Sequence, residues 1–417
     1  MSVILDQARL LLEQGRAKDA EIRIKEFLQQ EPDNHYAISL LARCHYHRKQ
    51  FNEGLQLMAE AIRLQPEESF YYYLRGFGFY QLDKPQPAID SLQRATVLNP
   101  WHAEYYGLLS FVWLGEKKFE EALLKANEGL ALEADNLTCL NARSMALNKM
   151  KKTEEAMATM QDALAQDPDS EFTHSTVGWN LLERGRHKEA VVHFREALRI
   201  NPNMQSAQSG LKESLKSAIP PYKWLLQYSF WVNNQGKRLK TAMPIILYIV
   251  FRLLMAVFQQ SSKTIIFAWI LAGFYLLFVI GSWTMNAIAN FFLLFHRDGK
   301  YALSNTERWS AIAVVSAMTS GLLLVAISFM ESFGISNQEL LLAAGLVLLS
   351  LALPLGEIDY PVQFKNTAKR NVFSLLLIAL GLLSLLCALI FPAQALMMMA
   401  VYGVGFIIYN WSGILRY

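Results

Sequence analysis

A repeat period of 34 residues constrains the fold of the first half of this chain more than any other feature. Prolines recur at one phase of this period, and small residues recur at a second phase. A proline ends a helix because its ring cannot continue one, and a small residue lets two helices approach closely. We therefore expect repeated units of helix, turn and helix. The prolines are Pro32, Pro66, Pro100, Pro168 and Pro202, and the small residues are Ala20, Gly54, Ala88, Ala122, Ala156 and Ala190.

Six registers of this period fit the sequence without an insertion. They are 1–34, 35–68, 69–102, 103–136, 137–170 and 171–204. The last register resembles the tetratricopeptide repeat (TPR) family through Gly178, Leu181, Gly185, Ala190, Phe194, Ala197 and Pro202. This resemblance implies an all-α solenoid of six helix-turn-helix repeats. Residues 205–217 are polar and suit the capping helix that such an array needs, so we place the cytoplasmic repeat domain at 1–217.

The resemblance also implies a concave groove lined by fixed positions of each repeat. Carried over residue by residue, these positions are rich in aromatic side chains and poor in charge, which suits an extended peptide or a partner helix. The alternative for any one aromatic is that it only packs the two helices of its repeat together. The candidate partner-binding residues are Arg43, Tyr46, Phe70, Tyr73, Phe77, Tyr80, Phe111, Asn141, Met145, Asn148 and Trp179.

Five further residues fall at groove positions, namely Tyr36, His47, Gln81, Lys149 and Glu183. Some family members hold a C-terminal carboxylate with a clamp of Lys, Asn and Arg. Asn141 and Lys149 are suggestive, but the basic partners in the next repeat are absent. Capture of a chaperone tail is therefore not indicated.

The composition changes after the repeats. Residues 1–204 hold 24 Lys+Arg and 29 Asp+Glu, whereas residues 205–417 hold 15 and 7. A sparse, basic second half indicates membrane spans with basic flanks, and the balance does not suit a nucleic-acid partner. Residues 218–241 place Trp224, Tyr228 and Trp231 on one helical face beside lysines, so we predict an interfacial amphipathic elbow. The alternative is a last capping helix on the sixth repeat.

Six stretches in residues 242–417 are candidates for transmembrane helices, each needing roughly 20 apolar residues. The first is short and contains Arg252, which either faces a polar path, reaches the membrane surface, or sits in an interfacial helix. The six are Ala242–Phe258, Ile265–Trp283, Trp309–Met330, Leu340–Gly356, Val372–Phe391 and Ala393–Leu415.

Loop charges support six spans with both termini cytoplasmic. Under that topology the inner segments hold 13 Lys+Arg and the outer loops hold one, Lys263. This bias follows the positive-inside rule and predicts a multi-pass protein of the cell (inner) membrane. If 242–258 lies on the membrane instead of crossing it, five crossings remain and the C-terminus lies outside.

Two polar segments interrupt the membrane half. We interpret 284–304 as an interfacial helix and basic turn, followed by a helix N-cap at Ser304 with Glu307 three residues on. Glu357 and Asp359 follow a span; they either bind a cation or relay protons, or form a solvated loop, and we favour the loop.

The sequence contains no phosphate-binding loop, dinucleotide fingerprint or nucleophile elbow, and no span carries a histidine to act as a base. His35, His45 and His47 lack the spacing of a metal site. We therefore expect no catalytic residue, cofactor or metal. Two hypotheses remain: a membrane-anchored scaffold that binds a cytoplasmic protein, with a membrane protein as a further candidate partner, or a transporter or channel component regulated by the repeats.

Overall fold

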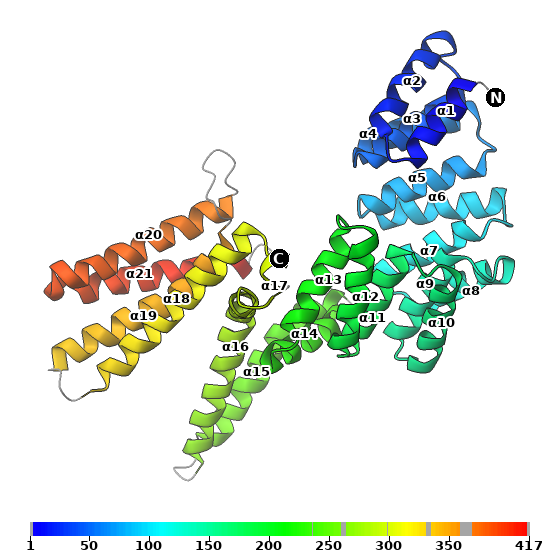
Figure 1. The fold of residues 1–417 in the computed structure, drawn as a ribbon. Coiled ribbons are helices and arrows are strands. Elements are labelled where there is room, and N and C mark those ends of the chain that lie inside the picture. Colours follow the sequence, from blue (N-terminus) through cyan, green and yellow to red (C-terminus); the bar gives the residue numbers. More distant parts are fainter. Residues whose placement is uncertain are drawn as a thin grey trace. The chain divides into compact units, whose positions relative to one another are not determined.

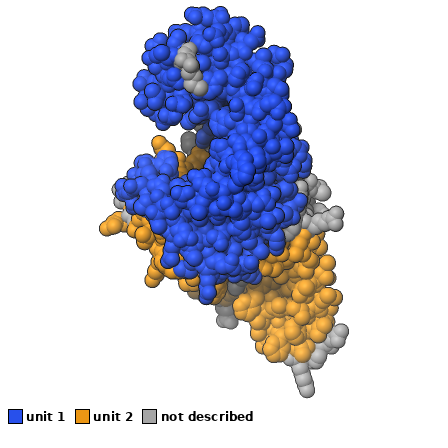
Figure 2. Space-filling view, turned by 90° about the vertical axis from the view of Figure 1, so that its right-hand side faces the viewer, with its two compact units in different colours: residues 1–180, 196–202 blue, residues 181–195, 203–417 orange. Residues whose placement is uncertain are grey.

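The computed structural model describes residues 3–235, 237–259, 264–297, 299–330, 335–358 and 369–414, and all regular elements in these ranges are helices (Figure 1). The chain divides into two compact units (Figure 2). Unit 1 comprises residues 1–180 and 196–202, and unit 2 comprises residues 181–195 and 203–417. The expected all-α fold, a helical solenoid followed by long apolar helices, is confirmed.

The helices before residue 205 form six pairs in the predicted registers. From the third pair onward, the first helix of each pair begins 34 residues after the first helix of the preceding pair. The pairs are α1 (Val3–Glu13) and α2 (Ala17–Gln30), α3 (His35–His47) and α4 (Phe51–Leu64), α5 (Ser69–Gln81) and α6 (Pro85–Leu98), α7 (Ala103–Gly115) and α8 (Phe119–Leu132), α9 (Leu137–Lys149) and α10 (Thr153–Gln166), and α11 (Glu171–Glu183) and α12 (His187–Ile200).

The turn inside each pair has the same backbone conformation. One residue per turn has a positive φ, between 53° and 77°, and these residues again lie 34 apart. Glycine adopts this left-handed region freely, whereas other residues are strained there. Glycine occupies the position in the first and last repeats only. The six residues are Gly15, Lys49, Asp83, Lys117, Lys151 and Gly185.

The small residues lie where the helices of a pair meet. Ala20, Ala88 and Ala122 are completely buried, as are Leu40 and Leu92 beside them in the core. A small side chain at the crossing lets the backbones approach and lets larger neighbours fill the space around it. The period in the sequence is therefore the period of these helix contacts.

Two helices follow at the phase that a seventh pair would have: α13 (Gln205–Lys216) and α14 (Pro220–Asn233). Within unit 2, the Tyr222 hydroxyl donates to Glu213, and the Gln227 amide donates to the carbonyl of Leu182 at 3.0 Å. Part of the segment predicted as an elbow thus packs as a capping helix does. Trp224 and Trp231 nevertheless remain 73% and 45% exposed.

The remaining helices are α15 (Lys237–Phe258), α16 (Ile265–Leu293), α17 (Gly299–Ala302), α18 (Asn305–Ser328), α19 (Ile335–Glu357), α20 (Lys369–Ile390) and α21 (Pro392–Ile414). Within the described residues, five helices are long and apolar enough to cross a membrane: α16, α18, α19, α20 and α21. The apolar part of α15, Ile245–Phe258, is shorter, so a sixth crossing stays a prediction.

Two expectations for this region need correction. Helix α16 runs without a break to Leu293, so residues 284–293 do not start a separate interfacial helix. Glu357 ends α19 and accepts a hydrogen bond from Tyr409, so it does not lie in a solvated loop; Asp359 lies outside the described residues. The N-cap at Ser304 is confirmed, because its side chain and that of Glu307 form a complete capping box.

Glycines and hydroxyl groups hold the apolar helices of unit 2 together. A Cβ on Gly321 of α18 would lie 2.9 Å from the carbonyl oxygen of Gly345 on α19, so the two backbones are nearly in contact. Small residues at such crossings are typical of helix packing in membranes. The Ser350 and Tyr402 hydroxyls are 2.9 Å apart and link α19 to α21.

The shared turn conformation gives a reciprocal test. Nothing lies within 4 Å of a Cβ built on Gly15, so Gly15→Ala adds only backbone strain, and we expect a loss of about 1 kcal/mol in the free energy of unfolding. Lys151→Gly removes such strain and should raise stability by up to about 1 kcal/mol. Chemical denaturation of the full chain in detergent measures both. Equal effects of the same sign would contradict this account of the turns.

Candidate functional site

The candidate groove residues lie on the first helices of the repeats, from α3 to α11. Eight of them are partly exposed: Arg43, Phe70, Tyr73, Phe77, Tyr80, Phe111, Met145 and Trp179. Tyr46, Asn141 and Asn148 are buried. The structure therefore brings most of the predicted side chains to accessible positions, while contact with a partner stays a prediction. Figure 2 shows unit 1 hollowed on one side between its two ends.

A cavity of about 230 Å³ lies between α3 and α5. Its lining is Arg43, Tyr46, His47, Leu74 and Phe77, so it contains four predicted groove residues and one that sequence reasoning missed. Arg43 makes no ion pair or hydrogen bond with any described residue. The cavity thus combines apolar walls with a guanidinium group that has no carboxylate partner within the described chain.

Burial shifts the pKa values of two titratable side chains that line this cavity. Desolvation, and then the positive charge of Arg43, lower the pKa of His47, so the neutral imidazole is favoured. Desolvation raises the pKa of Tyr46, so its hydroxyl stays protonated. That hydroxyl has no hydrogen-bond partner among the described residues. Arg43 is therefore the charge that this cavity presents.

Tyr46 is held in place by two glycines. A Cβ on Gly54 of α4 would lie 2.3 Å from the Tyr46 ring, and a Cβ on Gly78 of α5 would lie 2.5 Å from its hydroxyl. Gly54 occupies the phase at which the other five repeats carry alanine. Glycine lacks the methyl group of alanine, and this leaves room for the ring of Tyr46. The periodicity of the sequence does not predict this contact.

Stacked rings continue from this cavity along α5 and α7. The ring of Tyr73 lies 5.7 Å from that of Phe70 and 5.2 Å from that of Tyr105. Tyr105 is 1% exposed, and its hydroxyl is 3.1 Å from Ser69. Such offset ring contacts add to the area that the side chains bury. The rings are therefore fixed in place before any partner binds.

Glu104 of α7 connects three consecutive repeats. It accepts hydrogen bonds from the hydroxyls of Tyr73 at 3.4 Å and Thr138 at 2.9 Å. Burial, and then the charge of Glu104, raise the pKa of Tyr73. Sequence reasoning missed Glu104, because its partners lie 31 and 34 residues away on other helices.

The fifth repeat places asparagine side chains at groove positions, and part of this polarity serves contacts inside the solenoid. The Asn141 amide donates to the carbonyl of Leu137 at 2.9 Å and to the Thr173 hydroxyl at 3.0 Å, so it links α9 to α11. The ring of Phe111 meets the exposed ring of Phe172 at 5.7 Å, edge to face. The accessible aromatic surface therefore extends from α3 to α11.

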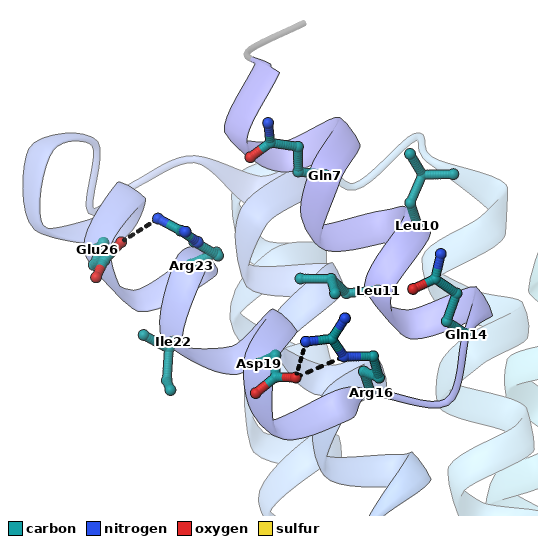
Figure 3. A pocket seen from close by; sticks show the side chains of 9 residues that line it. All are labelled: Gln7, Leu10, Leu11, Gln14, Arg16, Asp19, Ile22, Arg23 and Glu26. Carbon is teal, nitrogen blue, oxygen red and sulfur yellow. Dashed lines mark hydrogen bonds and ion pairs between the residues drawn. The ribbon is translucent and has the colours of Figure 1, made fainter.

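A larger cavity of about 590 Å³ lies between α1 and α2 (Figure 3). Its two arginines are both paired, Arg16 with Asp19 at 2.7 Å and Arg23 with Glu26 at 3.6 Å. Leu10 and Ile22 add exposed apolar surface to its lining. Because its charges are satisfied internally, this cavity favours no particular ligand.

The geometry and the family matches agree on the class of protein. Residues 13–95 match the family described as anaphase-promoting complex, cyclosome, subunit 3, and residues 143–170 match the tetratricopeptide repeat family. The first half of the chain is therefore a tetratricopeptide-repeat solenoid, a fold suited to protein–protein interaction, and nothing in these matches indicates catalysis. No curated protein matches the chain significantly in sequence.

Several solved structures resemble the chain. A thermophilic TPR protein from Thermus thermophilus is 18% identical and covers 43% of this chain and 98% of its own, with a TM-score of 0.41. MamA from Desulfovibrio magneticus is 13% identical over 40% and 94%, with a TM-score of 0.35. YrrB, a TPR protein with an unusual peptide-binding site, is 15% identical over 45% and 97%, with a TM-score of 0.32.

The packing of Tyr46 can be tested with one methyl group. Gly54→Ala should lower the free energy of unfolding by about 1–3 kcal/mol, because the new Cβ overlaps the buried ring. Gly115→Ala is the matched control. Nothing lies within 4 Å of a Cβ on Gly115, so alanine should be neutral or stabilise by up to about 1 kcal/mol. Thermal unfolding of both variants gives the comparison, and similar losses for the two would refute the packing explanation.

Proposed function

We propose that this protein is a membrane-anchored TPR scaffold, with a cytoplasmic repeat domain at 1–217, an elbow at 218–241 and a membrane domain at 242–417. The observation that carries the proposal is Arg43, a guanidinium group without an ion-pair partner among the described residues, in an apolar cavity. A buried or half-buried charge without a partner costs stability, and a ligand carboxylate would offset that cost.

The partner that fits is a protein segment, either extended or helical. One apolar side chain of this segment enters the cavity between α3 and α5, and a nearby carboxylate pairs with Arg43. Neighbouring residues of the segment lie against the rings of Phe70, Tyr73 and Tyr80. Rigid aromatic side chains are effective anchors because they bury a large area and lose little conformational freedom on binding.

The second half of the chain would hold this array at the cell membrane. Five apolar helices, the 13-to-1 distribution of basic residues and the exposed Trp224 and Trp231 support that role. The proposal places both termini in the cytoplasm, with α15 as the sixth crossing. The very short outer loops leave little surface for recognition outside, so a further membrane-protein partner would bind along the helices.

The transporter alternative relied on Arg252 as a charge facing a polar path. In the structure Arg252 is exposed on α15, and it does not line the cavity of about 260 Å³ between α16, α18 and α19. A scaffold function therefore has the better support.

Aromatic side chains of the groove provide a direct test. The triple variant Tyr73→Ala, Phe77→Ala and Tyr80→Ala should lose the protein that the wild type retains after crosslinking in native membranes and purification, as identified by mass spectrometry. The control is Trp101→Ala, which removes an aromatic side chain that is 80% exposed after α6 and is not part of the groove. If the triple variant retains the same protein at the wild-type level, the groove does not bind it.

Topology can be tested separately. A reporter that is active only in the cytoplasm, fused after Tyr417, should be active if six helices cross the membrane. A second fusion after Gln259 should be inactive, because that site follows the first crossing. An active Gln259 fusion together with an inactive Tyr417 fusion would show that α15 lies on the membrane surface and that five helices cross.

A further inference from the structure

The cavity of about 260 Å³ between α16, α18 and α19 lies entirely within unit 2. This volume is below the range typical of drug-sized ligands, so it suits a small group. Six lining residues have polar side chains: Asn286 and Asn290 of α16, Thr306, Glu307 and Ser310 of α18, and Glu357 of α19. Trp283 adds an indole ring at the wall. The sequence analysis placed Asn286 and Asn290 in an interfacial segment, Glu307 in a helix cap and Glu357 in a loop, without connecting them.

The ionisable side chains that line this cavity are both carboxylates. Glu307 is positioned by the backbone N–H of Ser304, which donates to one of its oxygens at 2.8 Å. Glu357 accepts from the Tyr409 hydroxyl, which is itself 2.8 Å from the buried Ser374 hydroxyl. Both carboxylates are thus fixed on separate helices. A second anion entering the cavity would be repelled by them.

A third acceptor in the wall is an amide. Asn290 is 3% exposed, and its amide oxygen has no hydrogen-bond partner among the described residues. A buried acceptor without a partner costs free energy, and this cost disappears when a donor occupies the site. A group with several N–H donors and a positive charge would satisfy this amide and complement both carboxylates.

We propose that this cavity binds a primary ammonium group. The group comes either from the headgroup of an aminophospholipid or from a free small amine. Three donors on one ammonium nitrogen match the acceptors that α16, α18 and α19 present, and the Trp283 ring in the wall is a group to which cations are attracted. The inference is independent of the proposed groove function, since none of these residues belongs to the groove.

Two lysines of α13 already interact with the same wall. The Lys212 ammonium group is 2.7 Å from Glu307, and the Lys216 ammonium group donates to Asn286 at 2.7 Å. Lys216 is 2% exposed and is also 2.8 Å from Glu213. An ammonium ligand therefore competes with Lys212 for Glu307, and occupancy of the cavity is linked to the position of α13.

The experiment measures binding to the full chain. Ethanolamine is titrated into the protein in a detergent without amines, and thermal unfolding reports the shift in midpoint, with NaCl at matched ionic strength as the control. Native mass spectrometry from nanodiscs containing phosphatidylethanolamine and phosphatidylglycerol reports which lipid stays bound. We expect an upward shift with ethanolamine, retention of phosphatidylethanolamine over phosphatidylglycerol, or both, and these two arms separate the free amine from the lipid source.

Three variants sharpen the test. Asn290→Leu keeps the side-chain size and removes the acceptor, so it should weaken ammonium binding about tenfold or more and should raise the midpoint of the ligand-free protein. Glu357→Gln removes one charge and should also weaken binding. Lys212→Met removes the cation that competes for Glu307 and should strengthen ammonium binding. Equal shifts with NaCl and ethanolamine without lipid preference, no response in either arm, or wild-type binding by both Asn290→Leu and Glu357→Gln would overturn the proposal.

Discussion

The close approach of two helices at a small residue is the contact on which the repeat array depends. Each repeat buries too little apolar surface to be stable alone, so its helices must pack tightly against each other and against the next pair. Alanine serves this purpose at Ala20, Ala88 and Ala122, all completely buried. In the second repeat Gly54 takes its place, and Tyr46 fills the volume that becomes free. The same exchange sets one wall of the cavity beside Arg43.

Much of the fold follows from the sequence because it is encoded locally. The period of 34 residues predicted six helix pairs, and hydropathy indicated the five long apolar helices. Contacts between distant residues were not predictable in this way. Glu104 accepts hydrogen bonds from Tyr73 and Thr138 in the neighbouring repeats, and no residue spacing in the sequence predicts these two contacts. The positive φ of Lys49 and Lys151 was equally unpredictable, because glycine marks this turn position only in the first and last repeats, at Gly15 and Gly185.

Polar residues in the membrane half show the same limit. Asn286 and Asn290 fall in the segment 284–304, which the sequence led us to interpret as an interfacial helix and basic turn, because amides are costly in an apolar span. In the structure α16 continues past both, and Asn286 accepts a hydrogen bond from Lys216, which belongs to another helix. The cost of placing Asn286 in this apolar helix is offset by this partner on α13. Polar groups within apolar helices therefore depend on tertiary partners that periodicity cannot identify.

The central claim is that the cavity between α3 and α5 receives a side chain of a partner protein. Site-specific photocrosslinking in native membranes tests it most directly, with a photoreactive phenylalanine analogue at Phe77 in the cavity wall and at Trp101 on the exposed surface. We expect one dominant crosslinked protein from position 77, lost when Arg43→Glu is added, and no such product from position 101. Equal crosslinking from both positions, unaffected by Arg43→Glu, would contradict it.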